Sequence, residues 1–297
     1  MIIHDHVTAP PHGEKFVLAE NQKILLMPVG DVHYLSEGWP LHKFVGHMKW
    51  GMDHGAWFLG MGEYLDPLSA SQRFLTNMLR DSAKKELSEF ITGAVEDFYR
   101  LIEFTKGRWI GLLEGDHRWD FADGTTADQL LCSYLGCKFL GDAALIRITY
   151  PELHPKKKPR VHAEADCLVY AHHGVGSSRL SGGHLHRVED LTKFVEADIY
   201  LMGHSHAKTS APIDRQVVTP DGVHYHRTKV VARTGTWQKS YVSKRPQALT
   251  TPAVESRATY AEKAAYIPAA MGGIALGIGY EPIDGSEYMR PTIHFSV

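Results

Sequence analysis

The chain has 297 residues, of which 43% are hydrophobic and 22% charged, and its formal net charge is −2. That length can bury a core without a disulfide or metal staple, and the near-neutral balance excludes a global attraction to nucleic acid or membranes. The three cysteines form no Cys-x-x-Cys pair and predict reduced thiols in a cytoplasmic setting. The N-terminal residues lack a basic stretch followed by an apolar one, and no apolar run approaches about 18 residues, so neither a signal peptide nor a membrane span is expected.

Short apolar runs that end at glycine predict strands, and apolar residues at helical intervals predict helices. In the first half of the chain we expect strands at 23–30, 56–62 and 108–115, and helices at 39–55, within 69–107 (two of them) and at 126–136. The last of these helices has a Thr126 cap and a Gly136 stop.

The second half continues the alternation and then becomes rich in β-structure. We expect strands near 137–141, 144–150, 161–174 and 198–206, a helix at 188–197, and β-structure at 222–235 and from 272 onward. The basic, proline-rich residues 151–160 predict a solvated loop, because no aromatic residues interleave with the charges as in a nucleic-acid site. Strands alternating with helices predict an α/β fold in a single domain, 1–297, with no linker.

Five predicted strand ends carry carboxylates and imidazoles. In chain order these are Asp31 and His33, Glu63 and Asp66, Asp116 and His117, His172 and His173, and His204 and His206. Open α/β sheets bind ligands beyond the carboxyl ends of their strands, so these side chains are expected to converge. Carboxylates and imidazoles suit Mn, Fe and Zn. There are too many for one tetrahedral site, whereas two ions about 3.5–4 Å apart would use them with one bridging carboxylate.

In order, residue type and strand context, the five blocks resemble the calcineurin-like metallophosphoesterase superfamily. Its pattern is Asp-x-His, Gly-Asp-x-x-Asp, Gly-Asn-His, a lone His after a strand, and Gly-His-x-His. The resemblance covers about 22–210 and implies a sandwich of two mixed β-sheets flanked by helices, which 211–297 would complete as a β-rich extension.

The resemblance also implies the role of each residue. Asp31, His33 and His206 would hold the first metal; Asp116, His172 and His204 would hold the second; and Glu63 would bridge them. His117 would be the catalytic histidine, and Asp66 would orient it. The cofactors would be two divalent ions, with manganese favoured over zinc, iron or nickel.

Two positions depart from the family pattern. Glu63 stands where the family has Asp, and Asp116 stands where it has Asn. Three carboxylates against two divalent ions leave a formal charge of +1, which favours hard ions such as manganese. Protein phosphatases of the family carry Arg directly after the Asp66 position, and Pro67 stands there, which weakens a Ser/Thr phosphatase interpretation.

Several histidines leave alternatives open. His172 and His173 are neighbours and point different ways on an extended chain. The family ligand follows the strand directly, so His172 is the expected ligand, and His173 faces substrate or packs. His184 lies in a glycine-rich stretch that predicts a mobile loop, which either touches substrate or is only solvated. His4 and His6 are assigned to a tail.

The activity that the resemblance implies is hydrolysis of phosphate esters by a metal-bridging hydroxide. A phosphodiesterase acting on nucleotides or nucleic acid is favoured, although the net charge does not itself indicate nucleic acid. The alternatives are a phosphomonoesterase and a non-catalytic binding or scaffold protein that retains the fold and the metal site. The expected partner is a phosphate-ester substrate, with no membrane, and the oligomeric state is open.

Overall fold

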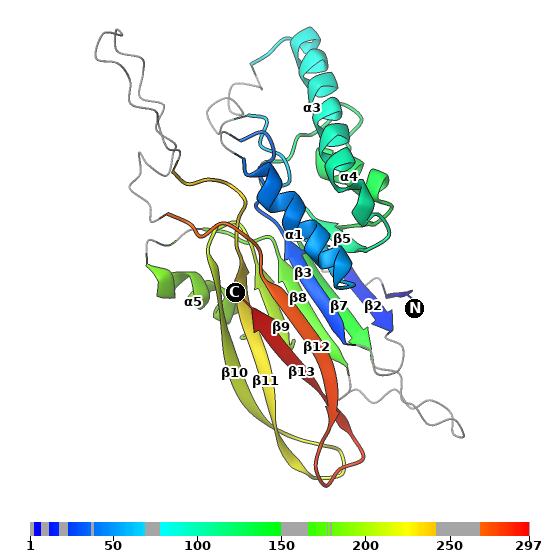
Figure 1. Cartoon of the computed structure of the whole chain (residues 1–297), viewed down its shortest axis with the longest axis vertical. Coiled ribbons are helices and arrows are strands. Elements are labelled where there is room, and N and C mark those ends of the chain that lie inside the picture. Colours follow the sequence, from blue (N-terminus) through cyan, green and yellow to red (C-terminus); the bar gives the residue numbers. More distant parts are fainter. Residues whose placement is uncertain are drawn as a thin grey trace.

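The computed structural model describes residues 3–6, 12–17, 23–36, 39–68, 78–149, 166–176, 178, 180–241 and 268–296, with only the backbone described for the first two segments. Its strands form two sheets that pack face to face (Figure 1). The six-stranded sheet has the order β13 (Met289–Ser296), β12 (Ala275–Pro282), β3 (Ile24–Val29), β4 (Trp57–Gly60), β5 (Trp109–Leu113) and β6 (Lys138–Gly141). The seven-stranded sheet has the order β1 (Ile3–His6), β2 (His12–Val17), β7 (Ala143–Thr149), β8 (Cys167–His172), β9 (Ile199–Met202), β11 (His224–Thr234) and β10 (Lys208–Val218).

Both sheets are mixed, and each contains a block of parallel strands, which is central in the seven-stranded sheet and reaches one edge of the six-stranded sheet. β3, β4, β5 and β6 are parallel neighbours in one sheet, and β8, β9 and β11 are parallel neighbours in the other. Antiparallel strands flank both blocks, including the long hairpin of β10 and β11 and the hairpin of β12 and β13. The carboxyl ends of the two parallel blocks meet at one edge of the sandwich, which is where open α/β sheets bind ligands.

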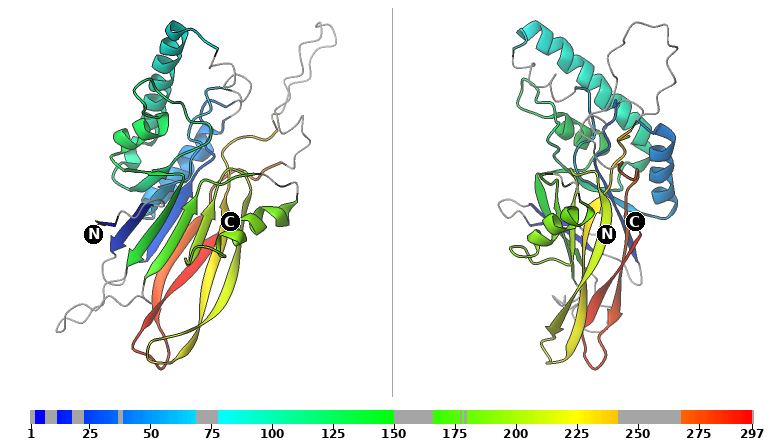
Figure 2. Two further views of the ribbon diagram at one scale, coloured as in Figure 1. Left: turned by 180° about the vertical axis from the view of Figure 1, so that it is seen from behind. Right: turned by 90° about the vertical axis from the view of Figure 1, so that its left-hand side faces the viewer.

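Helices cover both outer faces, as the edge-on view in Figure 2 shows. α1 (Leu41–Asp53), α3 (Asp81–Ile102) and α4 (Ala127–Leu135) pack on the six-stranded sheet, and a 3₁₀ turn (Glu103–Thr105) follows α3. α5 (Ser181–Leu191) packs on the seven-stranded sheet through Val188 and Leu191. Apolar side chains from both inner sheet faces form the central core. The α/β prediction and its two mixed, helix-flanked sheets are therefore confirmed.

The local signals that predicted α4 act as expected. The Thr126 side chain accepts from the Gln129 amide while the Gln129 side chain accepts from the Thr126 amide, which is a capping box. The helix ends at Gly136, whose φ of 67° is a left-handed conformation that glycine adopts without steric cost. The cysteines are unpaired, also as predicted.

Other expectations were wrong, because tertiary packing overrode local signals. The helix expected at 188–197 is α5, which begins at Ser181 and includes the two glycines assigned to a mobile loop. β10 was not predicted, and His4 and His6 lie in β1 at a sheet edge instead of in a tail. The basic segment 151–160 lies outside the described residues, as do residues 69–77 of the stretch 69–107 in which two helices were expected; α3 is the one α-helix in the described part of that stretch. After residue 210 the described strands divide between both sheets, although the assignment of 1–297 to one domain stays a prediction. No described helix is long and apolar enough to cross a membrane.

Candidate metal centre

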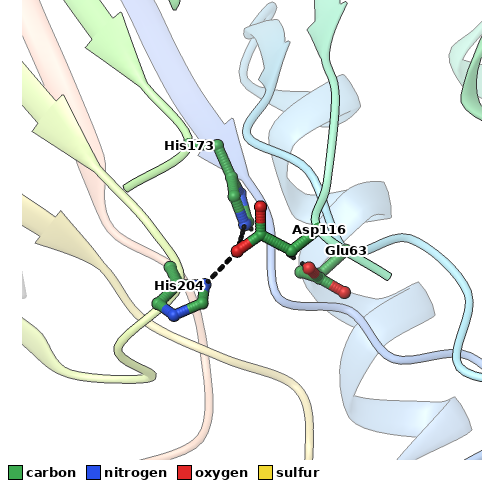
Figure 3. A group of neighbouring side chains, drawn as sticks. All are labelled: Glu63, Asp116, His173 and His204. Carbon is green, nitrogen blue, oxygen red and sulfur yellow. Dashed lines mark ion pairs between the residues drawn. The ribbon is translucent and has the colours of Figure 1, made fainter. Parts of the chain in front are cut away.

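The predicted strand ends converge at the shared edge of the two sheets. Two groups of side chains there each have one potential ligand atom per residue within 4.8 Å of the others, and a third set, His33, Glu63 and His117, overlaps both. The first group is Asp31, His33 and His206, and the second is Glu63, Asp116, His173 and His204. Figure 3 shows the second group, in which His173 and His204 of the seven-stranded sheet face Asp116 and Glu63 of the six-stranded sheet.

The first group is buried and compact. His33 Nε2 and His206 Nε2 are 3.0 Å apart, and Asp31 Oδ1 lies 4.0 Å and 3.6 Å from these two atoms respectively. Asp31 and His33 are at most 2% exposed. The structure thus brings together the three residues predicted for the first metal.

The second group is more open to solvent. Asp116 Oδ2 lies 3.1 Å from His204 Nδ1 and 3.9 Å from His173 Nε2, and Glu63 Oε1 lies 3.4 Å from His173 Nε2. The Asp116 side chain is 54% exposed, whereas those of Glu63 and His173 are almost fully buried. This group therefore has one face through which a substrate can approach.

The structure differs from the sequence prediction at one ligand: His173, not His172, enters the second group. β8 continues through His172, so His172 points to the outer face of the sheet and the next residue points into the sandwich. His173 Nδ1 lies 2.7 Å from the Met61 carbonyl oxygen and donates to it, which leaves Nε2 free to bind a metal. His172 Nδ1 instead accepts from the Gly174 amide, so its second nitrogen carries the proton and offers no lone pair.

Asp66 also differs from expectation. Its Oδ2 lies 3.4 Å from His33 Nδ1, so it is placed to orient His33, which is a candidate metal ligand. The carboxylate beside His117 is that of Glu63, whose Oε2 lies 2.9 Å from His117 Nδ1 and whose Oε1 accepts from the His117 amide. Glu63 is thus within ligand distance of His33 and His117 as well as of the second group, so it stands between the two sets. The extra methylene of Glu relative to Asp gives it this reach.

The unpaired polar atoms of these side chains and the distances between them are those expected of metal ligands. Asp31 Oδ1 and His173 Nε2 are buried and have no hydrogen-bond partner in the described structure, and buried Glu63 Oε2 has only its ion-pair contact with His117 Nδ1. A buried polar atom left unpaired costs about 1–3 kcal/mol, so such a concentration calls for an absent partner. Two atoms that each lie about 2.0–2.2 Å from one ion are roughly 3–4 Å apart, which is the spacing found in both groups. The donor set of carboxylates and imidazoles suits manganese, iron or zinc.

The backbone at the candidate centre adopts left-handed conformations that are unfavourable for residues other than glycine. Six non-glycine residues in the described part of the chain have positive φ, and five of them are candidate ligands. The values are 47° for Asp31, 51° for His33, 56° for Glu63, 64° for His204 and 58° for His206; the sixth residue is the adjacent Leu35. Conformations of this kind cost on the order of 1–3 kcal/mol each and cluster at functional sites.

Main-chain hydrogen bonds hold these strained turns together. The amides of Val32 and His33 donate to the Glu63 carbonyl, and the His204 amide donates to Asp31 Oδ2. Only glycine fits at position 62, because the Cβ of any other residue would lie 2.4 Å from His173 Nδ1. The two ligand sets are therefore linked through backbone as well as through Glu63.

Three supporting residues were missed because no motif marks them. Thr236 Oγ1 and the Trp237 amide both donate to the Asp31 carbonyl from the end of β11. Arg233, which is 1% exposed, donates from Nη1 to the Gly203 carbonyl in the turn before His204. All three follow the last motif in sequence, so only the fold relates them to the centre.

Burial and neighbouring charges shift the pKa of several side chains at the candidate centre. Burial raises the pKa of Asp31 to about 6, against the opposing charges of His33 and His173. Burial acts to lower the pKa of His173, but the Glu63 carboxylate and the Asp31 charge outweigh it and raise the value to about 9. Burial, reinforced by His33, lowers the pKa of His206 to about 3, so this imidazole is neutral and ready to bind a metal.

A buried carboxylate next to the centre provides a test of pH dependence. Asp128 Oδ2 accepts from the Gly115 amide, and burial, aided by Glu63, raises the pKa of Asp128 to about 7. Between about pH 4 and 7 the folded chain binds this proton more tightly than the unfolded chain, so Asp128 lowers stability as pH rises through that window. We expect Asp128→Asn, which keeps an acceptor for Gly115, to gain stability relative to the unmodified protein from pH 5 to pH 8, by on the order of 1.4 kcal/mol per pKa unit.

The measurement is urea unfolding of metal-stripped protein at pH 5 and pH 8. Exposed Asp53→Asn on α1 is the matched control and should leave the pH profile unchanged. Parallel profiles for Asp128→Asn and the unmodified protein would contradict the proton on Asp128.

His184 lies apart from both ligand groups. It is half-buried on α5, and its carbonyl accepts from Arg233 Nε. The structure brings the other predicted site residues to one edge of the sandwich, except that His172 faces away. A metal-binding or catalytic role for each of them stays a prediction.

Comparisons with known proteins add little at the level of residues. No protein-family model matches the sequence, and neither does any curated protein. Among solved structures, the chain is similar to vacuolar protein sorting 29 from Cryptosporidium parvum, with 10% sequence identity and a TM-score of 0.33. The match covers 92% of this chain and 98% of that one. At this TM-score the similarity supports no inference about function or about individual residues.

Proposed function

We propose that the chain is a metal-dependent phosphoesterase of the calcineurin-like type, with phosphodiesters as the favoured substrates. The observation that supports this most is the pair of ligand groups that share Glu63, with His117 beside them. Two divalent ions bound there would polarise phosphoryl oxygens and lower the pKa of a water molecule. Asp31, His33 and His206 are the residues proposed to hold one ion, and Asp116, His173 and His204 the other, with Glu63 between them.

His117 is the proposed catalytic acid. Its side chain is 32% exposed, and the Glu63 carboxylate engages its Nδ1, so Nε2 is the atom left to face a substrate. A proton held on Nε2 can pass to the departing alkoxide oxygen, and a neutral or cationic ring can donate to a phosphoryl oxygen. Glu63 fixes the ring in the orientation that this transfer requires.

The charge of the centre favours a diester over a monoester. A phosphodiester carries one negative charge at neutral pH, whereas a monoester carries nearly two. The centre already contains three carboxylates, and the arginine next to His117 is committed, because Arg118 Nε lies 3.3 Å from both Glu114 and Asp120. A monoester would therefore meet more unbalanced negative charge than a diester.

The alternative is a binding or scaffold protein that retains the fold and the metal site. The observation that favours it is the occupation of both Glu63 oxygens by His117, through its amide and its ring. A carboxylate engaged in this way competes with metal bridging. Metal binding alone does not separate this alternative from the enzyme, because an inert site also binds metal.

Turnover separates the two. Metal-stripped protein is titrated with Mn²⁺, Zn²⁺, Ni²⁺ and Mg²⁺, and hydrolysis of bis-p-nitrophenyl phosphate and p-nitrophenyl phosphate is followed in parallel. We expect diester cleavage to be restored best by Mn²⁺ and to exceed monoester cleavage. A folded protein that binds two ions and turns over neither ester would overturn the enzyme proposal, and a faster monoester reaction would reverse the substrate preference.

A further inference from the structure

A second pocket lies on the outer face of the seven-stranded sheet, between the carboxyl ends of β8 and β9 and helix α5. Its volume is about 260 Å³, close to the lower end of small-molecule sites. His172 lines it, whereas the adjacent His173 points to the opposite face of the sheet and joins the metal centre. The backbone of β8 therefore separates this pocket, which we call the outer pocket, from the centre.

Three hydrogen-bond donors line the outer pocket. Because the Gly174 amide donates to His172 Nδ1, the proton of that ring lies on Nε2, which is left as a donor. The side chains of Arg187 and Tyr170 also line the pocket, and Arg187 lies near enough to Asp190 for its charge to help lower the pKa of that carboxyl. The one acidic residue in the pocket lining is Asp190, which forms an ion pair with Lys193: Lys193 Nζ lies 2.6 Å from Asp190 Oδ1.

A buried cation stands behind these donors. Arg233 is almost fully buried on the same face, and in the described part of the chain its guanidinium contacts the carbonyls of His184 and Gly203 but no carboxylate. Burial lowers the pKa of Arg233 to about 10, while the charge of Asp31 acts to raise it. Two arginines, Arg187 at the outer pocket and Arg233 behind it, therefore stand against one lining acid, Asp190.

Apolar side chains form the remaining walls. Leu191 and Met202 are buried at the base, whereas Phe194 is 68% and Val175 is 60% exposed. Exposed large apolar residues beside a pocket with converging donors are typical of a ligand with one charged end and one flat apolar end.

We propose that the outer pocket binds a small organic anion, with a phosphate-type head group on His172, Arg187 and Tyr170 and a flat apolar body against Phe194, Val175 and Met202. This site is distinct from the metal centre and does not depend on the proposed phosphoesterase activity.

Phenylphosphonate is the probe, because it has a charged head and a flat ring and its carbon–phosphorus bond resists hydrolysis. Binding to the metal-stripped full chain is measured by titration calorimetry, with inorganic phosphate and benzyl alcohol as the separate halves of the probe. We expect phenylphosphonate to bind more tightly than either half. Arg187→Gln should weaken it about tenfold or more, because a charge-assisted hydrogen bond is lost.

His172→Asn retains an acceptor for the Gly174 amide and removes the Nε2 donor, so it should also weaken binding. Arg215→Gln is the matched control, since Arg215 is an exposed arginine on β10 outside the pocket lining. Arg215→Gln should bind phenylphosphonate as tightly as the unmodified protein does. His117→Gln, which changes the metal centre and not the outer pocket, should do so too.

Four outcomes would overturn the proposal. The first is that phenylphosphonate does not bind the unmodified protein, and the second is that it binds Arg187→Gln as tightly as the unmodified protein. The third is that benzyl alcohol binds as tightly as phenylphosphonate, and the fourth is that only His117→Gln loses phenylphosphonate binding. The last would place the anion at the metal centre. Arg187 is exposed, so its variant keeps the test decisive even where His172→Asn fails to fold.

Discussion

His173→Asn is expected to lose the metal ion of the second group, whereas His172→Asn retains it. The His173 ring aims Nε2 at Glu63 and Asp116 and anchors Nδ1 on the Met61 carbonyl, while the only lone pair of the His172 ring is taken by the Gly174 amide. Loss of an outer hydrogen-bond partner of a ligand typically costs 10–100-fold in metal affinity, so loss of the ligand itself should cost at least about 100-fold.

The measurement is metal content by elemental analysis after dialysis, followed by titration of Mn²⁺ into stripped protein. The two variants are a matched pair, because they make the same change at neighbouring positions. Equal losses of metal in both, or loss in His172→Asn alone, would return the ligand role to His172. Unfolding midpoints of the stripped proteins establish that any loss of metal is not a loss of fold.

His117→Ala is expected to reduce diester hydrolysis by roughly 10²–10⁴-fold, the usual contribution of a general acid, with bound metal unchanged. The effect should depend on the leaving group. A p-nitrophenolate leaves with little need of a proton, whereas an alkoxide needs one, so the variant should lose more activity on an alkyl-leaving diester.

His42→Ala is the control, since His42 is an exposed histidine on α1. An equal loss of activity on both kinds of diester would argue against proton donation by His117 and leave only transition-state hydrogen bonding. Loss of bound metal in His117→Ala would instead identify His117 as a ligand, consistent with its position beside His33 and Glu63.

The sequence by itself determined the type of fold and the chemistry of the centre. Apolar runs such as 24–29 end directly in Asp31 and His33, and parallel strands place their carboxyl ends at one edge, so the order of such blocks predicts their convergence. The caps of α4 were equally predictable, because Thr126 and Gly136 act on backbone within four residues of themselves.

Only the tertiary structure decided which neighbour of a pair faces the centre and what supports it. β8 includes His172, so His173 is the first residue after the strand and its side chain points to the face opposite to that of His172. The contact of Asp66 with His33, and the contacts of Thr236, Trp237 and Arg233, include pairs 205 or more residues apart in the sequence. α5 forms across two glycines because its apolar face is buried against β9 and β11, a gain in packing that local sequence preference does not contain.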